Sequence, residues 1–121
     1  MLIDTHCHLD YLKLNLAEVL NNCAQVGVEK MISISVDEEN MLLVQKLIET
    51  YPNVYGTIGI HPHEAKSWTS KIEEYFKTHY QHPKIVAFGE FGLDYFYMHS
   101  SKEEQRLAFE KQLELAVQCN M

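Results

Sequence analysis

A histidine-x-histidine pair follows a short apolar run at the start of the chain. Residues 1–3 predict a buried strand that leads into His6 and His8. Because side chains alternate between the faces of a strand, His6 and His8 point the same way, with Cα atoms about 6.6 Å apart. Two imidazoles at that separation can bind one divalent ion, at metal–nitrogen distances of about 2.0–2.1 Å. The flanking acids Asp4 and Asp10 could orient the two rings. The alternative interpretation is two unrelated surface histidines beside a turn.

Polar residues also follow two later apolar runs. His61 and His63, separated by a proline, follow residues 54–59, and Glu90 follows residues 85–88. Taken separately, the histidines could form a proline-stiffened turn, and Glu90 could be a strand-end acid in water. Ligands bind at the carboxyl ends of parallel strands, so three strand ends that deliver His, His and Glu to one edge favour a joint site.

Glu90 is the candidate for a ligand shared by two metal ions. It lies between Gly89 and Gly92, which we expect to let the backbone approach closely. Its two carboxylate oxygens can bridge two cations, and imidazoles can complete each coordination sphere. Such a pair of ions can hold both the attacking hydroxide and the leaving oxygen of a phosphoester. The pattern is therefore compatible with metal-dependent phosphoester hydrolysis.

Strands and helices are expected to alternate along the chain. The expected strands are residues 1–3, 31–36, 54–59 and 85–88. Apolar residues at helical spacing predict helices around residues 16–26, 41–48, 72–79 and 109–117. Asp37 and the Ser101–Glu104 capping box should begin two of these helices, and Asn120 should end the last. In that last helix the residues expected to face the core are Phe109, Leu113, Ala116 and Val117. The alternation predicts an α/β fold with a parallel sheet and right-handed crossovers.

The composition fits one globular domain: 121 residues, of which 46% are hydrophobic and 22% charged. No apolar run approaches the roughly 20 residues of a membrane span, and we expect neither a signal peptide nor a membrane partner. Cys7, Cys23 and Cys119 are odd in number and widely spaced, which favours free thiols in a reducing cytoplasm. By strand alternation Cys7 should point away from the two histidines and fill space in the core.

The net charge of −7 argues against binding of a polyanion through a broad basic surface. It does not exclude a nucleic-acid substrate at a metal site. Two bound divalent cations would reverse the local field where a phosphate must sit.

The chain resembles the TatD-like metal-dependent deoxyribonucleases, within the wider amidohydrolase-type barrels. Three motifs carry the resemblance in order, and each alone is much less specific than the three together: IDTHCHLD at 3–10, GIHPHEA at 59–65 and GEFGLDYF at 89–96. The later segment QRLAFEKQL at 105–113 also looks like the family's next helix.

The resemblance implies a TIM-type barrel that hydrolyses phosphodiester bonds in DNA. It implies two divalent metal ions, Mg²⁺, Mn²⁺ or Zn²⁺, held at His6 and His8, with Glu90 as a shared ligand. His61, His63 and Asp94 match family positions that line the same pocket, where they would bind substrate or orient the ligands.

The length of the chain departs from this family. A (β/α)₈ barrel typically needs about 250 residues, whereas this chain has 121 and predicts four βα units. We therefore expect residues 1–121 to be the N-terminal half of a single hydrolase barrel domain, with apolar sheet edges left open. The resemblance implies two further histidines and an aspartate from later strands. His79, His82 and His99 match none of those motifs and are expected to be solvated. Either a missing C-terminal half or a second copy of the chain would close the barrel.

Two other functions stay open. One is a different metal-dependent phosphoesterase whose barrel also opens with Asp-x-His-x-His, although the segment from Gly89 to Asp94 favours the nuclease. The other is a truncated, non-catalytic remnant that binds metal or a partner. We expect the 121 residues alone to bind metal weakly and to show no appreciable DNA cleavage.

Overall fold

Four parallel strands form one sheet in the computed structural model, which describes all residues from Met1 to Met121. The strands are β1 (Leu2–Cys7), β2 (Val28–Ser33), β3 (Val54–Ile58) and β4 (Ile85–Phe88), in the spatial order β1-β2-β3-β4. Every neighbouring pair is parallel, and each connection carries a helix. The predicted α/β fold with a parallel sheet is confirmed.

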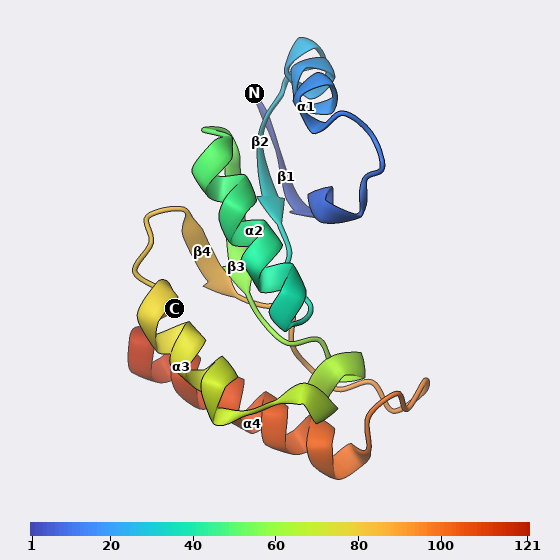
Figure 1. Ribbon diagram of the computed structural model, residues 1–121, viewed down its shortest axis with the longest axis vertical. Coiled ribbons are helices and arrows are strands. Elements are labelled where there is room, and N and C mark those ends of the chain that lie inside the picture. Colours follow the sequence, from blue (N-terminus) through green and yellow to red (C-terminus); the bar gives the residue numbers. More distant parts are fainter.

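Four helices accompany the strands. They are α1 (Leu16–Gln25), α2 (Glu38–Thr50), α3 (Ser70–His79) and α4 (Lys102–Cys119), with short 3₁₀ turns η1 (Leu9–Tyr11) and η2 (Pro62–Ser67). In Figure 1, α2 lies across the middle of the sheet, α1 lies beside β1 and β2, and α3 lies along α4 beyond β4.

The helix ends follow the expected capping chemistry. The Asp37 carboxylate accepts a hydrogen bond from the backbone N–H of Asn40 at 2.8 Å, where α2 begins. Ser101 and Glu104 form a reciprocal capping box at the start of α4. Asn120 ends α4 in the left-handed conformation, with φ of 56°.

The core lies between the sheet and the helices in two apolar clusters. The first contains Leu9, Leu20, Met31, Val44, Ile48 and Val54, and the second contains Met41, Ile58, Ile60, Ile72, Phe76 and Leu115. Cys7 packs against the first cluster, and its thiol donates to the carbonyl of Ile32 at 3.3 Å, as expected for a residue that fills the core. Burial raises the pKa of the Cys7 thiol to about 12, so the thiol is protonated and unreactive at neutral pH. All three cysteines are free.

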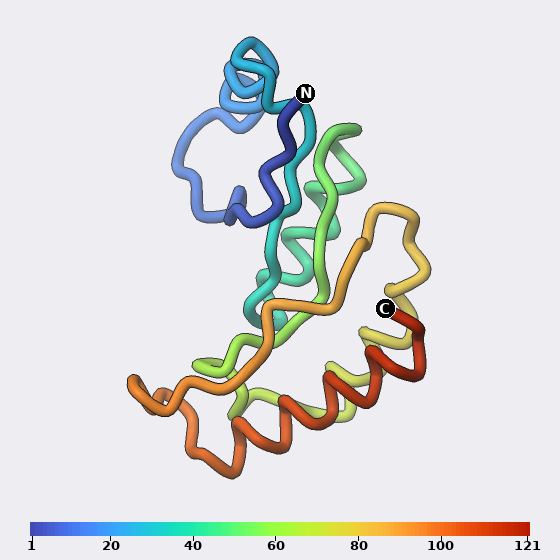
Figure 2. The backbone as a smooth tube through the Cα atoms, turned by 180° about the vertical axis from the view of Figure 1, so that it is seen from behind, coloured from blue at the N-terminus to red at the C-terminus, as the bar shows by residue number.

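The opposite face of the sheet has no helix over it. Seen from behind, the strands lie in front of α2 (Figure 2). Met1, Leu2 and Ile3 are exposed, so the expectation of a buried first strand is wrong for this chain. The reasons are that β1 is an edge strand, with a partner on the β2 side alone, and that one face of the sheet has no helix over it.

The face that α4 buries also differs from the expectation. Its buried residues are Gln105, Ala108, Gln112 and Leu115, whereas Leu113 and Val117 are exposed. Both buried glutamines hydrogen-bond to backbone groups of loops that follow the strands. These polar contacts set the orientation of the helix, and apolar spacing alone could not indicate them.

Two of the histidines expected to be solvated are partly buried. The His79 ring stacks on Tyr75 with centroids 3.8 Å apart, and His82 Nδ1 accepts a hydrogen bond from the backbone N–H of Lys84 at 3.1 Å. His79 is the last residue of α3, and His82 lies between α3 and β4. None of the helices is both long enough and apolar enough to cross a membrane.

Candidate metal centre

Three strand-end residues from opposite edges of the sheet come together. His6 lies near the end of β1, His8 directly follows that strand, and Glu90 follows β4. Each offers one ligand atom, and these atoms all lie within 4.8 Å of one another. His6 Nε2 lies 3.3 Å from Glu90 Oε2. The structure therefore has the placement that the sequence led us to expect, while the role of these residues as metal ligands stays a prediction.

Backbone hydrogen bonds to the neighbouring strands fix Glu90 in place. The Glu90 N–H donates to the carbonyl of Ser35 at 3.0 Å, and the Gly89 N–H donates to the carbonyl of Ile58 at 2.8 Å. Ser35, just beyond β2, donates from its buried hydroxyl to the carbonyl of Thr57 at 2.6 Å. The ends of β2, β3 and β4 are therefore tied together under the carboxylate.

The close backbone approach near Glu90 occurs at Gly59, not at the glycines expected from the sequence. A Cβ on Gly89 or Gly92 would meet no atom within 4 Å. A Cβ on Gly59 would lie 2.6 Å from the Glu90 nitrogen and would overlap the Gly89 carbonyl group. Gly59 is therefore the residue that lets the Glu90 segment cross the end of β3.

His61 lies on the other side of Glu90. Its Nε2 lies 3.6 Å from Glu90 Oε1, and its Nδ1 accepts a hydrogen bond from the backbone N–H of His63 at 3.1 Å. Burial lowers the pKa of His61, although the Glu90 carboxylate opposes this shift. The ring is therefore neutral at pH 7. Because Nδ1 is an acceptor, the proton of the neutral ring lies on Nε2, which faces Glu90.

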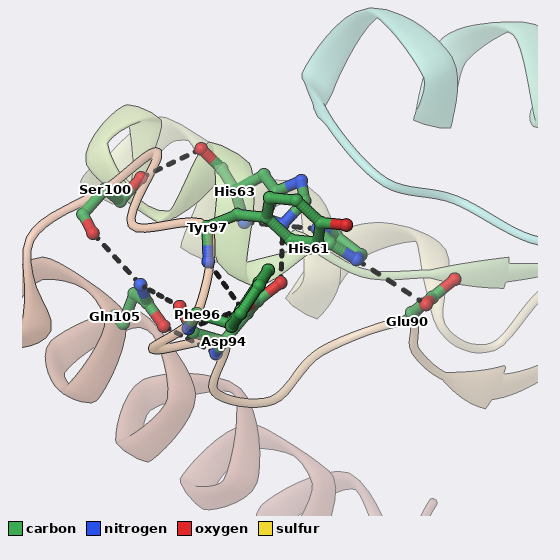
Figure 3. A network of polar contacts seen from close by, with 8 residues as sticks. All are labelled: His61, His63, Glu90, Asp94, Phe96, Tyr97, Ser100 and Gln105. Carbon is green, nitrogen blue, oxygen red and sulfur yellow. Dashed lines mark hydrogen bonds and ion pairs between the residues drawn. The ribbon is translucent and has the colours of Figure 1, made fainter.

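His63 pairs with Asp94 rather than with Glu90. His63 Nε2 lies 2.7 Å from Asp94 Oδ2 (Figure 3). This hydrogen bond, followed by those from the backbone N–H groups of Tyr97 and Phe96, lowers the pKa of the Asp94 carboxyl. Asp94 is therefore a charged partner that fixes the orientation of the His63 ring.

Neither flanking acid is hydrogen-bonded to a histidine ring. Asp4 Oδ1 accepts from the backbone N–H of His6 at 3.0 Å, and Asp10 Oδ2 accepts from the Asn40 side chain at 2.6 Å. The expectation that these acids orient the rings is therefore not met. His8 Nδ1 and Asp10 Oδ1 are both buried without a hydrogen-bond partner.

The sequence did not indicate several residues that support the candidate site. Ser35 and Thr57 are buried polar residues in otherwise apolar strand segments, and this contrast was the available signal. His99, although exposed as expected, lies 4.5 Å from the His63 ring between centroids, and Tyr97 lies 5.7 Å from it. No local pattern indicates those two contacts, because they join separate loops.

Two hollows meet at Glu90. One, of about 470 Å³, lies over the open face of the sheet and includes His6 and Phe91 in its lining. The other, of about 310 Å³, is lined by His8, His61 and His63 among other residues. Two imidazoles and a carboxylate that converge from separate strands are a donor set that suits a divalent transition metal. The buried and unpaired His8 Nδ1 adds a polar atom in need of a partner. These residues fit a metal ion.

A parallel α/β sheet with His and Glu side chains together at its carboxyl edge is typical of barrel-type metallohydrolases. The TatD related DNase family matches residues 3–121 of the chain, so the chain belongs to that family. It is 34% identical to the uncharacterized metal-dependent hydrolase YabD of Bacillus subtilis, covering 100% of this chain and 48% of the relative. It is 33% identical to the 3'-5' ssDNA/RNA exonuclease TatD of Escherichia fergusonii, covering 86% of this chain and 40% of that protein.

Solved structures with the same fold also include a TatD relative. The structure superposes on YJJV, a TatD homolog from Escherichia coli, with a TM-score of 0.86 and 33% identity, covering 98% of this chain and 48% of the other. An uncharacterized amidohydrolase from Saccharomyces cerevisiae has a TM-score of 0.78 at 20% identity, which indicates a shared fold alone. The four βα units thus match the N-terminal part of a TatD barrel. The chain spans about half the length of the curated relatives it matches.

Proposed function

We propose that residues 1–121 form the N-terminal half of a single barrel domain that hydrolyses phosphodiester bonds in DNA with divalent metal ions. The observation that carries this proposal is the convergence of His6, His8 and Glu90 within 4.8 Å in a chain of the TatD related DNase family. Below, "complete barrel" means this chain together with the segment or second copy that closes its sheet.

We propose that His6, His8 and Glu90 hold the metal, with Glu90 shared between two ions in the complete barrel. Mg²⁺, Mn²⁺ and Zn²⁺ are the candidates. When bound, the ions supply an activated hydroxide and neutralise charge on the phosphate. In the proposed arrangement Glu90 is the catalytic carboxylate, and His61 lies beside it with Nε2 3.6 Å from Oε1. His63 and Asp94 then form the wall against which the substrate binds.

DNA is the proposed substrate, and RNA is its closest alternative. Relatives at about 33% identity are named exonucleases for single-stranded DNA and RNA. The chain carries a net charge of −7, so the attraction for phosphate must come from the bound cations at the site. A different phosphoesterase or a non-catalytic remnant would behave differently in the experiment below.

The 121 residues alone should bind metal weakly and should not cleave DNA appreciably. Three ligands leave a divalent ion open to water and do not enclose two ions. For the protein as a whole we propose the reducing cytoplasm, because three free and widely spaced cysteines suit that compartment.

The experiment compares the Glu90→Gln variant of the complete barrel with Glu110→Gln, which removes an exposed carboxylate on α4. Cleavage of single-stranded DNA is measured in chelator and after Mg²⁺, Mn²⁺ or Zn²⁺ is restored. Glu90→Gln should lower kcat/KM by more than about 100-fold with little change in Tm, because metal-site carboxylates act through charge. Glu110→Gln should leave both unchanged.

Three results would argue against the proposal. Equal losses of Tm and activity in Glu90→Gln would indicate a structural role for that carboxylate. Hydrolysis of small phosphate monoesters without cleavage of DNA would indicate a different phosphoesterase. No metal-dependent cleavage of any ester would indicate a remnant.

A further inference from the structure

An exposed aromatic loop lies beside the candidate metal centre. The loop, from Leu93 to His99, connects the strand end that carries Glu90 to α4. Phe96 and Tyr97 are 85% and 64% exposed. Tyr95 is also exposed, so three aromatic side chains stand in water within three consecutive positions. Exposed aromatic residues so close together cost hydrophobic free energy and are typical of binding surfaces.

Side-chain hydrogen bonds hold the loop in this conformation. Asp94 Oδ1 accepts from the backbone N–H groups of Phe96 and Tyr97 at 3.0 and 3.1 Å. Gln105 accepts from the Asp94 N–H at 2.7 Å and donates to the carbonyls of Asp94 and Ser100 at 2.8 and 2.9 Å (Figure 3). Both ends of the loop are thus tied to one buried side chain of α4. The aromatic rings project from a preorganised loop, which lowers the entropy cost of binding.

The loop adjoins the wall of the polar hollow next to Glu90. The Tyr97 ring meets His63 edge-on, with centroids 5.7 Å apart, and Phe96 meets Tyr97 at 4.9 Å. Figure 3 shows Tyr97 at His63, with His61 between His63 and Glu90 in this view. A chain molecule that rests on Phe96 and Tyr97 can therefore extend past His63 toward Glu90.

Two of the chain's few cations lie at this loop. Lys66 Nζ donates to the carbonyl of His99 at 3.3 Å, and Lys102 Nζ lies 5.1 Å from the centre of the Tyr95 ring. The chain as a whole carries only ten Lys and Arg against seventeen Asp and Glu. Exposed aromatic rings flanked by cations are the combination that binds single-stranded nucleic acid, since bases stack on the rings and phosphates lie near the cations.

We propose that Phe96 and Tyr97 bind single-stranded nucleic acid by stacking against its bases, and so hold the strand for the metal centre. This inference rests on the function proposed above and adds the residues that would hold the substrate strand. Bases of a duplex are stacked on one another and cannot reach these rings without unpairing. The pair of rings, Phe96 and Tyr97, here called the platform, therefore selects single strands or frayed ends.

The test measures the Kd of a fluorescently labelled twelve-residue oligothymidylate for the complete barrel, by anisotropy in chelator so that no cleavage occurs. Phe96→Leu and Tyr97→Leu keep apolar bulk but remove the ring, and each should raise the Kd at least about fivefold. Phe96→Tyr and Tyr97→Phe keep the ring and should stay within about twofold of wild type. Val26→Leu, at an exposed site next to α1, should have no effect.

An abasic oligonucleotide of the same length isolates the stacking contribution. Wild type should bind it at least about fivefold more weakly than oligothymidylate, and the two leucine variants should no longer distinguish the two ligands so well. The inference is overturned if the leucine variants bind oligothymidylate like wild type. It is also overturned if they lose the abasic ligand equally, or if the ring-retaining variants lose as much as the leucine variants.

Cleavage assays keep this inference separate from the proposed function. If oligothymidylate binding follows the expected pattern but no phosphodiester is cleaved with added Mg²⁺, Mn²⁺ or Zn²⁺, the platform stands and the hydrolase proposal fails. If metal-dependent cleavage occurs but the leucine variants bind and cleave like wild type, the hydrolase proposal stands and the platform fails.

Discussion

Gly59 is the residue whose replacement should disturb Glu90 most directly. A methyl group at this position would lie 2.6 Å from the Glu90 nitrogen, against backbone that cannot rotate away. We expect Gly59→Ala in the complete barrel to cost about 1–3 kcal/mol of stability through overpacking. Because the carboxylate would shift, metal-dependent cleavage should fall on the order of 100-fold. Thermal unfolding and steady-state kinetics measure the two effects.

Gly92→Ala is the matched control for this prediction. It adds the same methyl group two residues after Glu90, where no atom lies within 4 Å. Its Tm and activity should remain near those of wild type. Equal effects of the two substitutions would contradict the view that close backbone contact at Gly59 positions Glu90.

The charge of Asp94 should make the order of the aromatic loop depend on pH. The His63 contact and two backbone N–H groups lower the pKa of this carboxyl, so its charged form is favoured in the folded loop. A carboxyl whose folded pKa is depressed contributes stability above its unfolded pKa and loses that contribution as the pH falls through the folded pKa. Hydrogen exchange, corrected for intrinsic rates, should show protection of the Phe96 and Tyr97 amides at pH 7 that disappears in acid. The Asp94→Asn variant should lack this pH step, and an identical step in that variant would refute the assignment.

The placement of the candidate ligands could be predicted because it depends on local rules. Alternation along a strand and the shared edge of parallel strands predict that His6, His8 and Glu90 lie at one edge of the sheet. Contact between residues of the two outer strands, β1 and β4, also requires the sheet to curl. The supports of the site could not be predicted in the same way. Gly59 rather than Gly89 makes the close contact, and Asp10 pairs with Asn40 rather than with a ring. Those outcomes depend on which loops meet in three dimensions, and the sequence carries no local signal for that.

At the scale of elements, α4 holds the loops that follow the strands in place through side-chain hydrogen bonds. Gln112 is buried, accepts from the Ile60 N–H at 2.7 Å, and donates to the carbonyls of Ile60 and Ala108 at 3.2 and 3.1 Å. Ile60 directly precedes His61, so this contact fixes the segment that carries the second histidine pair. The apolar spacing predicted the existence of α4 and the capping residues predicted its ends, but its buried face depends on these hydrogen bonds.

Gln112→Leu should therefore destabilise the fold. The substitution leaves the buried N–H and carbonyl of Ile60 without partners, at a cost of about 1–3 kcal/mol. Gln118→Leu, at an exposed position of the same helix, should stay within about 0.5 kcal/mol of wild type. Urea denaturation of both variants gives the comparison. A neutral or stabilised Gln112→Leu would show that apolar packing, rather than the hydrogen bonds, holds α4 in place.

At the scale of the whole molecule, the sheet has two free edges, β1 and β4, and one uncovered face. The count of four βα units already predicted this openness, and the structural match to about half of a TatD homolog agrees with it. Local sequence patterns could not tell that the apolar residues of β1 would be exposed. Their apolar character suits the interior of a closed barrel, where both faces of the strand would be covered.

The 121-residue chain should therefore self-associate when it is purified alone. Unpaired strand edges and exposed apolar residues such as Ile3 on β1 and Val86 on β4 favour pairing with other copies. Sedimentation velocity should show mass that increases with protein concentration. Lysine at Ile3 or Val86 should reduce the association, whereas lysine at the exposed Val26, outside the sheet, should not. A monodisperse monomer at all concentrations would contradict the half-barrel account.

The central claim is that His6, His8 and Glu90 bind a divalent metal. Anomalous X-ray scattering from crystals of the complete barrel grown with Zn²⁺ tests it most directly, because the peak locates the ion without reference to activity. If these residues bind the ion, an anomalous peak should lie about 2.0–2.3 Å from a nitrogen of His6, a nitrogen of His8 and an oxygen of Glu90. The proposed site would be contradicted if zinc fully occupied other sites on the protein while no zinc peak lay next to these three side chains.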